Sequence, residues 1–243
     1  MKRILLFFFA VCTAGFVSAQ TGLYGTKSGT AAKNPSATTP SSLAESGNLL
    51  FEENMDNVSN LSSNGWLFYN VDGGGATTYF QGSTSVFFAN NGNNDSYVAQ
   101  NYRGANGSLI DQWLVTPAIT SYGTTTFQFM ARSTGNEWPD HISIYYSPTG
   151  SNNLADYVLL MSPTTLPGSW TSYKQTVTAN GPVRFAVRYY ETDGGNEGSN
   201  SDYWGMDAVQ VYGSSYAVPV SKWWIASLFA FLGMAIVVKK VWF

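Results

Sequence analysis

In Thr124-Thr-Thr-Phe-Gln-Phe-Met-Ala131, apolar side chains recur at alternate positions from Phe127 onward. His141-Ile-Ser-Ile-Tyr-Tyr146 and Val183-Arg-Phe-Ala-Val-Arg-Tyr189 show the same period of two. Because successive side chains of a β-strand point to opposite faces, each run has one face suited to a core. The three runs therefore predict strands that bury one face against another layer.

Working outward from these runs, twelve short apolar or alternating segments are separated by clusters of Gly, Asn, Pro and Asp. Pro148-Thr-Gly150 is a typical turn sequence, and Asn180-Gly-Pro182 predicts a hairpin corner. So many short strands exceed an immunoglobulin sandwich and predict an all-β, antiparallel two-sheet jelly-roll sandwich. We expect strands at Leu49–Glu53, Gly65–Asn70, Thr77–Gln81, Ser85–Ala89, Ser96–Gln100, Gln112–Val115, Thr124–Arg132, His141–Ser147, Tyr157–Met161, Thr171–Thr178, Val183–Tyr190 and Tyr203–Tyr212.

The C-terminal run from Trp223 to Val238 is apolar on every side and is followed by Lys239 and Lys240. At about 1.5 Å per residue it spans roughly 24 Å, and snorkelling lysines extend that reach toward a bilayer core of about 30 Å. A buried core helix is the alternative interpretation. We expect residues 222–243 to be a transmembrane anchor with its basic end in the cytoplasm.

The N-terminus has the basic, apolar and small-residue order of a secretory signal peptide over residues 1–19, with cleavage before Gln20. Cleavage would remove Cys12, the only cysteine, so the exported chain would have no disulfide. A lipoprotein anchor on Cys12 is the alternative, but Val11 stands where a small residue is expected. We expect export through the Sec pathway and a domain outside the cytoplasm, at the cell surface or on the membrane.

Between these ends, residues 20–47 are a flexible Gly/Ser/Thr linker, residues 48–213 form one domain, and residues 214–221 are a hinge. Residues 20–221 contain seven Lys/Arg and all fifteen Asp/Glu, a net charge of −8. This acidity argues against nucleic acid as a partner and is compatible with divalent cations.

An ordered set of short blocks runs through the domain. The blocks are Phe51-Glu-Glu53, Gly65-Trp66, Val71-Asp-Gly73, Asp111-Gln-Trp-Leu-Val-Thr-Pro-Ala-Ile119, Phe127–Ser133, Ile144–Gly150, Trp170–Tyr173, Val183–Arg188 and Met206-Asp-Ala-Val209. The ordered set resembles a cleaved-adhesin or choice-of-anchor J domain, a MAM-like jelly roll found on bacterial surface proteins. Val218-Pro-Val-Ser221 before Trp223 is similar to the signature that opens C-terminal sorting tails, which implies a sorting or processing enzyme.

The resemblance implies a structural calcium ion that bridges the first and last strands. By position its ligands are Glu52 or Glu53 and Asp207, with Asp56 and Asp72 as weaker candidates. Carboxylate oxygens are the ligands that Ca²⁺ takes. The alternative is that the glutamates only face solvent and a polar edge, although Asp207 lies in an apolar strand where an unpaired carboxylate is costly. The sequence departs from the family at position 208, where Ala replaces a frequent Asp or Asn.

Two loops are candidates for ligand recognition, residues 134–140 and residues 191–204. The second is acidic, rich in glycine and bounded by aromatic residues, which suits an ion or a sugar. The favoured alternative is a solvated loop whose Trp204 packs under the sheet. The candidate ligand-binding residues are Trp138, Asp193, Glu197, Asp202, Tyr203 and Trp204.

Catalytic patterns are weak in this sequence. The one histidine, His141, follows Asp140, but neighbouring strand residues face opposite ways and no Gly-x-Ser-x-Gly motif supplies a nucleophile. Zinc chemistry lacks a second histidine or an exported cysteine. The resemblance implies an adhesive or ligand-binding module, and the weak catalytic patterns agree, so we expect a non-catalytic adhesion module that binds a host or matrix protein or glycan. A carbohydrate-binding accessory module is the alternative, and a cryptic glycan hydrolase is less favoured.

Overall fold

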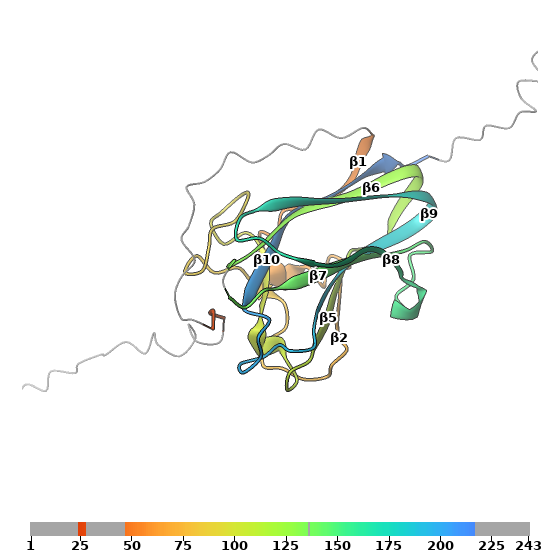
Figure 1. Cartoon of the computed structure of the whole chain (residues 1–243). Helices are drawn as coiled ribbons and strands as arrows, with labels where there is room; N and C mark the ends of the chain where they lie inside the picture. The colour runs from red at the N-terminus through yellow and green to blue at the C-terminus, as the bar shows by residue number, and fades with distance from the viewer. Residues whose placement is uncertain (1–23, 28–46, 136, 217–243) are drawn as a thin grey trace, which may run out of the picture.

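A computed structural model describes residues 24–27, 47–135 and 137–216 (Figure 1). The expected signal peptide, most of the linker, residues 217–221 of the hinge and sorting motif, and the membrane anchor lie outside the described residues. Within the described ranges, no helix has the length and apolar character needed to cross a bilayer.

The described part of the chain folds as β-strands with three short 3₁₀ helices, so the all-β prediction is confirmed. The 3₁₀ helices are η1 (Val58–Asn60), η2 (Tyr102–Gly104) and η3 (Leu154–Asp156). The strands are β1 (Asn48–Glu53), β2 (Leu67–Asn70), β3 (Phe80–Gln81), β4 (Val98–Asn101), β5 (Ile110–Val115), β6 (Ile119–Ser133), β7 (His141–Ser147), β8 (Val158–Thr165), β9 (Thr171–Glu191) and β10 (Tyr203–Ser214).

The strands form two antiparallel layers, consistent with the predicted sandwich (Figure 1). In one layer β10 pairs with β6 along one edge, and with β4 and then β1 along the other. In the other layer the strand order is β2, β5, β9, β7 and β8. The first and last strands of the domain are thus direct neighbours, which the calcium expectation requires.

Strand β9 belongs to both layers. Its first part, up to Val183, pairs with β6, and its last residues pair with β5 and β7. The predicted hairpin at Asn180-Gly-Pro182 is therefore wrong. Gly181, at φ +128°, and Pro182 bend the chain, but β6 runs alongside and continues the ladder, so the strand passes from one sheet to the other without reversing.

Two further segments differ from the sequence expectation. Residues 85–89 form no strand, because the amides of Val86 and Phe87 donate to the carbonyl of Ser83 in a turn. Both side chains are nevertheless buried, so their apolar character reflects packing of a loop. Strand β3 is reduced to two residues at the edge of its sheet.

The main core lies between the layers. Phe127 of β6 stacks on Phe185 of β9 with ring centroids 4.7 Å apart and an interplanar angle of 5°. Trp66 and Trp204 are buried in the same cluster. A second cluster around Phe87, Tyr97 and Tyr203 fills the space beneath residues 80–89 and supports the segment after β3.

Candidate functional site

Strand β10 changes its partner at Asp207. Strand β4 pairs with it as far as Met206, and β1 pairs with it from Val209 onward, with the last residue of β1 opposite Val209. The register against β6 shifts between Asp207 and Gln210, and Ala208 has φ 51°. Asn and Asp are the non-glycine residues best suited to this left-handed region, which gives a backbone reason for the family's usual residue at position 208.

The carboxylate of Asp207 is fully buried at this junction. It accepts backbone amide hydrogens from Asn91, at 2.8 Å, and from Ala208, at 2.6 Å. Burial raises the pKa of Asp207 to about 7, and the charge of nearby Asp56 adds to the effect. Burial therefore disfavours the charged form of Asp207, and the charge of exposed Asp56 disfavours it further.

Glu53, the last residue of β1, joins Asp207 and Asp56 at the junction. Burial and the charge of Asp56 raise the pKa of Glu53. Its carboxylate accepts the amide of Met55, which has φ 54°, and Asp56 accepts the hydroxyl of Ser96 at 2.7 Å. These carboxylates are hard-oxygen donors of the type Ca²⁺ takes, and backbone carbonyls or water would complete its shell.

The other two calcium candidates lie elsewhere. Glu52 points outward and accepts the side-chain amide of Gln210 at 2.7 Å. Asp72 organises a turn by accepting the amides of Gly74 and Asp111 at 3.0 and 2.7 Å. In the part of the chain that the structure describes, no three His, Cys, Asp or Glu side chains converge as a ready-made metal group. Among the candidates, Glu53 and Asp207 are the two whose pKa values the charge of Asp56 raises.

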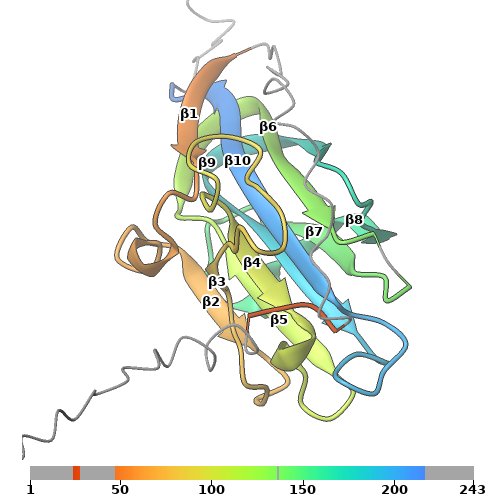
Figure 2. The ribbon, with the colours of Figure 1, turned by 90° about the vertical axis from the view of Figure 1, so that its left-hand side faces the viewer.

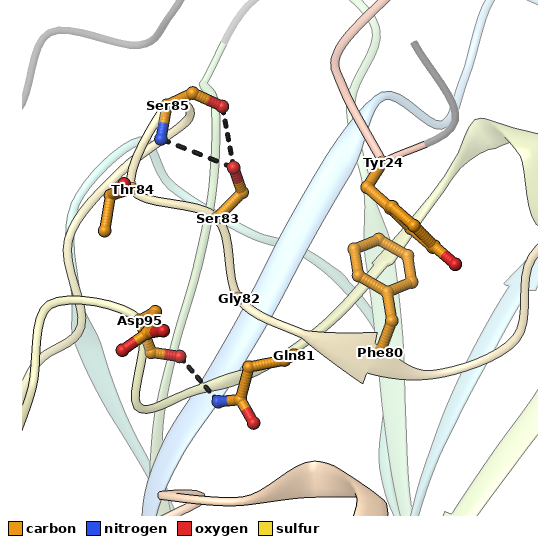
Figure 3. A pocket seen from close by; sticks show the side chains of 8 residues that line it. All are labelled: Tyr24, Phe80, Gln81, Gly82, Ser83, Thr84, Ser85 and Asp95. Carbon is orange, nitrogen blue, oxygen red and sulfur yellow. Dashed lines mark hydrogen bonds between the residues drawn. The ribbon is translucent and has the colours of Figure 1, made fainter. Parts of the chain in front are cut away.

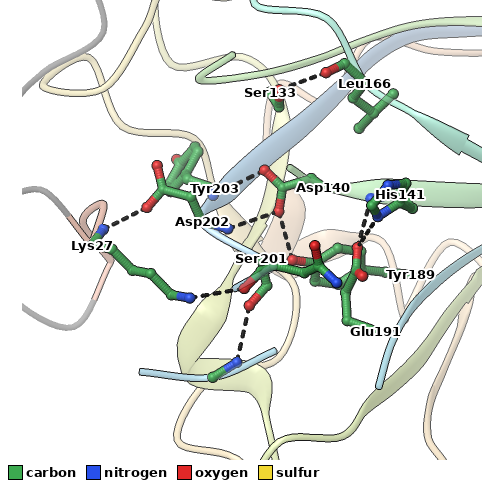
Figure 4. Close-up of polar contacts among 12 residues, drawn as sticks. Lys27, Ser133, Asp140, His141, Leu166, Tyr189, Glu191, Ser201, Asp202 and Tyr203 are labelled. Carbon is green, nitrogen blue, oxygen red and sulfur yellow. Dashed lines mark hydrogen bonds and ion pairs between the residues drawn. The ribbon is translucent and has the colours of Figure 1, made fainter. Parts of the chain in front are cut away.

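A second polar cluster lies at the start of β10 (Figure 4). The buried carboxylate of Asp140 accepts the hydroxyl of Tyr189 at 2.6 Å and the amides of Asp202 and Tyr203 at 3.0 and 3.2 Å. Burial raises the pKa of Asp140 to about 7. Asp140 therefore holds the end of the acidic loop, residues 192–202, and the start of β10 against Tyr189 of β9.

Glu191 is the partner of His141 in this cluster. Its carboxylate accepts the backbone amide of His141 at 2.7 Å and contacts ring Nδ1 at 2.8 Å. Burial raises the pKa of Glu191 to about 8. Glu191 is fifty residues from His141 in the sequence, and the antiparallel pairing of β7 with β9 brings the two together. The sequence alone therefore suggested only adjacent Asp140 as a partner of His141.

The predicted ligand-binding residues divide into three groups. Tyr203 and Trp204 are fully buried, so their proposed stacking on a sugar is corrected: they are core residues. Asp202 is also buried, whereas Asp193 and Glu197 are exposed. Trp138 is half-buried, and the ammonium of Lys27 lies 5.7 Å from its ring centroid.

An open cleft of about 500 Å³ lies beside β3, at the edge of the sheet (Figure 3). Tyr24 forms one wall, with its ring centroid 4.6 Å from that of Phe80. Ser83 is fixed to the domain by the hydroxyl of buried Tyr97, because the Ser83 amide donates to that hydroxyl at 2.8 Å and the Ser83 carbonyl accepts from it at 2.9 Å. We call this space the β3 cleft; its lining residues are Tyr24, Phe80, Gln81, Gly82, Ser83, Thr84, Ser85 and Asp95.

The sequence profile of the Cleaved Adhesin Domain matches residues 48–193. The chain belongs to the Cleaved Adhesin Domain family. The expected family is thereby confirmed, while the expected sorting tail lies outside the described residues. Comparison with curated proteins finds no match.

Solved structures agree with this fold. The K3 cleaved adhesin domain of Lys-gingipain from Porphyromonas gingivalis W83 is 18% identical, with a TM-score of 0.51, over 69% of this chain and 99% of that domain. The K2 cleaved adhesin domain of Lys-gingipain is also 18% identical, with a TM-score of 0.50, over 66% and 98%. At this identity the likeness shows a shared β-sandwich. The Cleaved Adhesin Domain chain is an adhesion or binding module by family.

Proposed function

We propose that this Cleaved Adhesin Domain protein is an exported, surface-anchored and non-catalytic adhesion module that binds a saccharide in the β3 cleft. The observation that carries the proposal is the lining of that cleft. Tyr24 and Phe80 supply aromatic rings, and the hydroxyl of Ser85 and the carboxylate of Asp95 supply hydrogen-bonding groups beside them (Figure 3). Concave sites with apolar rings and a few polar groups are the usual form of small-ligand sites.

The aromatic wall is accessible to a ligand. Tyr24 is 38% exposed, while Phe80 is half-buried and packs against Tyr203, with ring centroids 5.9 Å apart. Such a ring pair offers an apolar surface to the C–H face of a sugar, and the neighbouring hydroxyl and carbonyl groups suit its hydroxyls. This position replaces the aromatic residues of the acidic loop as the proposed recognition surface.

The cleft chemistry favours binding over hydrolysis. Asp95 is the one carboxylate among the eight lining residues, whereas a glycosidase uses two carboxyl groups that flank the scissile bond. The carboxylates of the second polar cluster, Asp140 and Glu191, are buried and engaged with neighbouring donors. They serve packing and orientation in this account.

A protein ligand is the second candidate, supported by the free edge of strand β8. Among the described strands, β8 pairs only with β7, and its Val158 and Leu159 are 51% and 46% exposed. Exposed apolar residues on an edge strand suit a host or matrix protein that adds a strand or packs on the edge. Binding at β8 and binding at the β3 cleft are separable by mutation.

We also propose a structural Ca²⁺ at Glu53, Asp56 and Asp207. Bound there, the ion would offset the charge that these carboxylates concentrate and would tie β1 to β10. Export by the N-terminal signal, anchoring by residues 222–243, and recognition of Val218-Pro-Val-Ser221 by a sorting enzyme complete the proposal. Fractionation of cells that carry the chain with and without residues 222–243 tests the anchor, because loss of the segment should release the domain from the membrane.

A glycan array tests the ligand class. The full chain in detergent is labelled and compared with Tyr24→Ala in the cleft and with Tyr216→Ala, a matched control whose ring is 76% exposed outside it. We expect a related set of glycans to bind, Tyr24→Ala to weaken binding about two- to tenfold, and Tyr216→Ala to leave it unchanged. Absence of bound glycans, or equal binding by all three chains, would overturn the saccharide proposal.

A further inference from the structure

The short segment Tyr24–Lys27 lies against the domain, although the sequence predicts a flexible linker there. The ammonium of Lys27 donates to the carbonyl oxygens of Gly198 and Asn200, each at 2.8 Å. The backbone amide of Lys27 donates to the carboxylate of Asp202. One lysine is therefore held by its side chain and its main chain together.

The other residues of the segment also contact the domain. The carbonyl of Gly25 accepts the side-chain amide of Asn101 at 3.1 Å, and Thr26 is buried. Tyr24 packs its ring on Phe80 of β3. The segment thus crosses from the acidic loop to the β3 cleft in an extended path, and every residue of it has a contact.

The surroundings of the ammonium suit a cation. It lies 5.9 Å from the ring centroid of Tyr102 and 5.7 Å from that of Trp138, within range of cation–π attraction. Burial lowers the pKa of Lys27, while the charges of the surrounding carboxylates raise it. Those carboxylates are Asp202, Asp140, Asp193 and Glu191.

The acceptor carbonyls are fixed by the acidic loop itself. The amide of Asn200 donates to the carbonyl of Asp193 at 2.8 Å, and the amide of Ser199 donates to its carboxylate at 3.2 Å. Position 198 admits only glycine, because a Cβ there would lie 2.2 Å from the carbonyl oxygen of Gly194. The loop therefore presents its two carbonyls through internal contacts that do not involve Lys27.

We propose that these groups form a binding site for a lysine-containing peptide segment, and that the chain's own Tyr24–Lys27 is its occupant. We call it the lysine socket: the carbonyls of Gly198 and Asn200, the carboxylate of Asp202, and the rings of Tyr102 and Trp138. The socket does not depend on a saccharide, whereas the β3 cleft depends on the docked segment for its Tyr24 wall.

Chain length permits the docking to be intramolecular. Residues 28–46 separate Lys27 from Gly47, and nineteen residues reach about 65 Å when extended. Figures 1 and 2 show residues 24–27 at the end of the sandwich away from the start of β1. Because the tether keeps the segment at a local concentration of about millimolar, even a weak site remains filled.

Peptide binding in trans tests the socket directly. The host is the full chain carrying Tyr24→Ala and Lys27→Met, which removes the two side chains of the resident segment that fill it. The probe is a fluorescent peptide of residues 21–30, and its matched control carries norleucine in place of Lys27. We expect the lysine peptide to bind the vacated chain at least tenfold more tightly than the norleucine peptide, and more tightly than it binds the wild-type chain.

Equal binding of the two peptides, or no binding to the vacated chain, would overturn the proposal. Trypsin gives a second readout on the full chain, because cleavage after a docked Lys27 requires the segment to leave the socket. We expect Asp202→Asn to speed cleavage at Lys27 severalfold. The control is Lys33→Met, which changes a charge in the same linker but outside the socket, and it should leave the rate of cleavage at Lys27 unchanged. An unchanged rate in Asp202→Asn would also contradict the proposal.

Discussion

The hydroxyl of Tyr189 donates a 2.6 Å hydrogen bond to the carboxylate of Asp140. Both groups are fully buried, and the bond joins the C-terminal end of β9 to the residue that precedes β7. The same carboxylate also receives two amides from the start of β10. Asp140 is thus a common anchor for three segments that are distant in the sequence.

This arrangement predicts the pH dependence of stability. The folded-state pKa is raised from 3.8 to about 7 for Asp140 and from 4.5 to about 8 for Glu191. The folded protein therefore binds these protons more tightly than the unfolded chain does, and the resulting stabilisation is complete below about pH 4 and is lost as pH rises through 7 and 8. Thermal scans should show a midpoint that falls between pH 5 and 8.

The variant Asp140→Asn separates the contribution of Asp140 to the pH dependence from the contributions of the other titrating groups. Its midpoint should be lower overall, since the amide nitrogen cannot accept the Tyr203 amide, but its decline with pH should be shallower than in the wild type. Lys27, Glu191 and Asp202 are the other charged groups at this site and are unchanged in the variant. A thermal midpoint of the wild type that rises between pH 5 and 8 would contradict the account.

Gly82 predicts a steric limit at the β3 cleft. A Cβ at this position would lie 2.2 Å from a ring carbon of Tyr97, which is buried and hydrogen-bonded to Ser83. Gly82→Ala should therefore lower the free energy of unfolding by about 1–3 kcal/mol. Denaturant titration measures the change, with the exposed neighbour variant Thr84→Ala as control. Equal stability of both variants would show that the ring adapts without cost.

Arg132 is a buried cation, and we attribute its contribution to the free energy of unfolding to the packing of its side chain. Its guanidinium lies 4.3 Å from the ring centroid of Phe87, and burial lowers its pKa to about 10. Within the described residues its Nη1 atom has no hydrogen-bond partner. Arg132→Met preserves the length of the side chain, so it should cost about 2 kcal/mol less in unfolding free energy than Arg132→Ala. Equal costs would mean that the charge itself stabilises the fold.

Calcium should stabilise the junction of β1 and β10. At a hundredfold excess over its dissociation constant, an ion that binds only the folded state adds about 2.7 kcal/mol. The thermal midpoint of the full chain should therefore rise by several degrees in millimolar calcium relative to excess chelator. Glu53→Gln should abolish the rise, whereas its outward-facing neighbour variant Glu52→Gln should keep it. A wild-type midpoint indifferent to calcium would remove the proposed ion.

The sequence was informative where burial follows periodicity. Alternation in residues 124–131 and 141–146 predicted strands that the structure contains, within β6 and β7. It was misleading at Asn180-Gly-Pro182, because turn residues also serve a strand that bends between two sheets. No sequence pattern indicates the docking of Lys27, because its partners are backbone carbonyls and the segment around it has few apolar residues.

The predicted ligand-binding residues also show the limit of reading single segments of sequence. Tyr203 and Trp204 border a loop in the sequence, yet they begin the central strand β10 and are buried there. The β3 cleft was not foreseen because Tyr24 and Phe80 meet only after the N-terminal segment docks. Contacts between segments far apart in sequence require the strand pairing to be known first.

Isothermal titration of the full chain with the strongest glycan from the array tests the central claim most directly. We predict one binding site per chain. Ser85→Ala in the β3 cleft should weaken binding by up to about tenfold through the loss of one hydrogen-bonding hydroxyl, whereas Ser162→Ala on β8 should leave it unchanged. Binding that is unaffected by Ser85→Ala and Tyr24→Ala would place the ligand elsewhere on the sandwich and contradict the account.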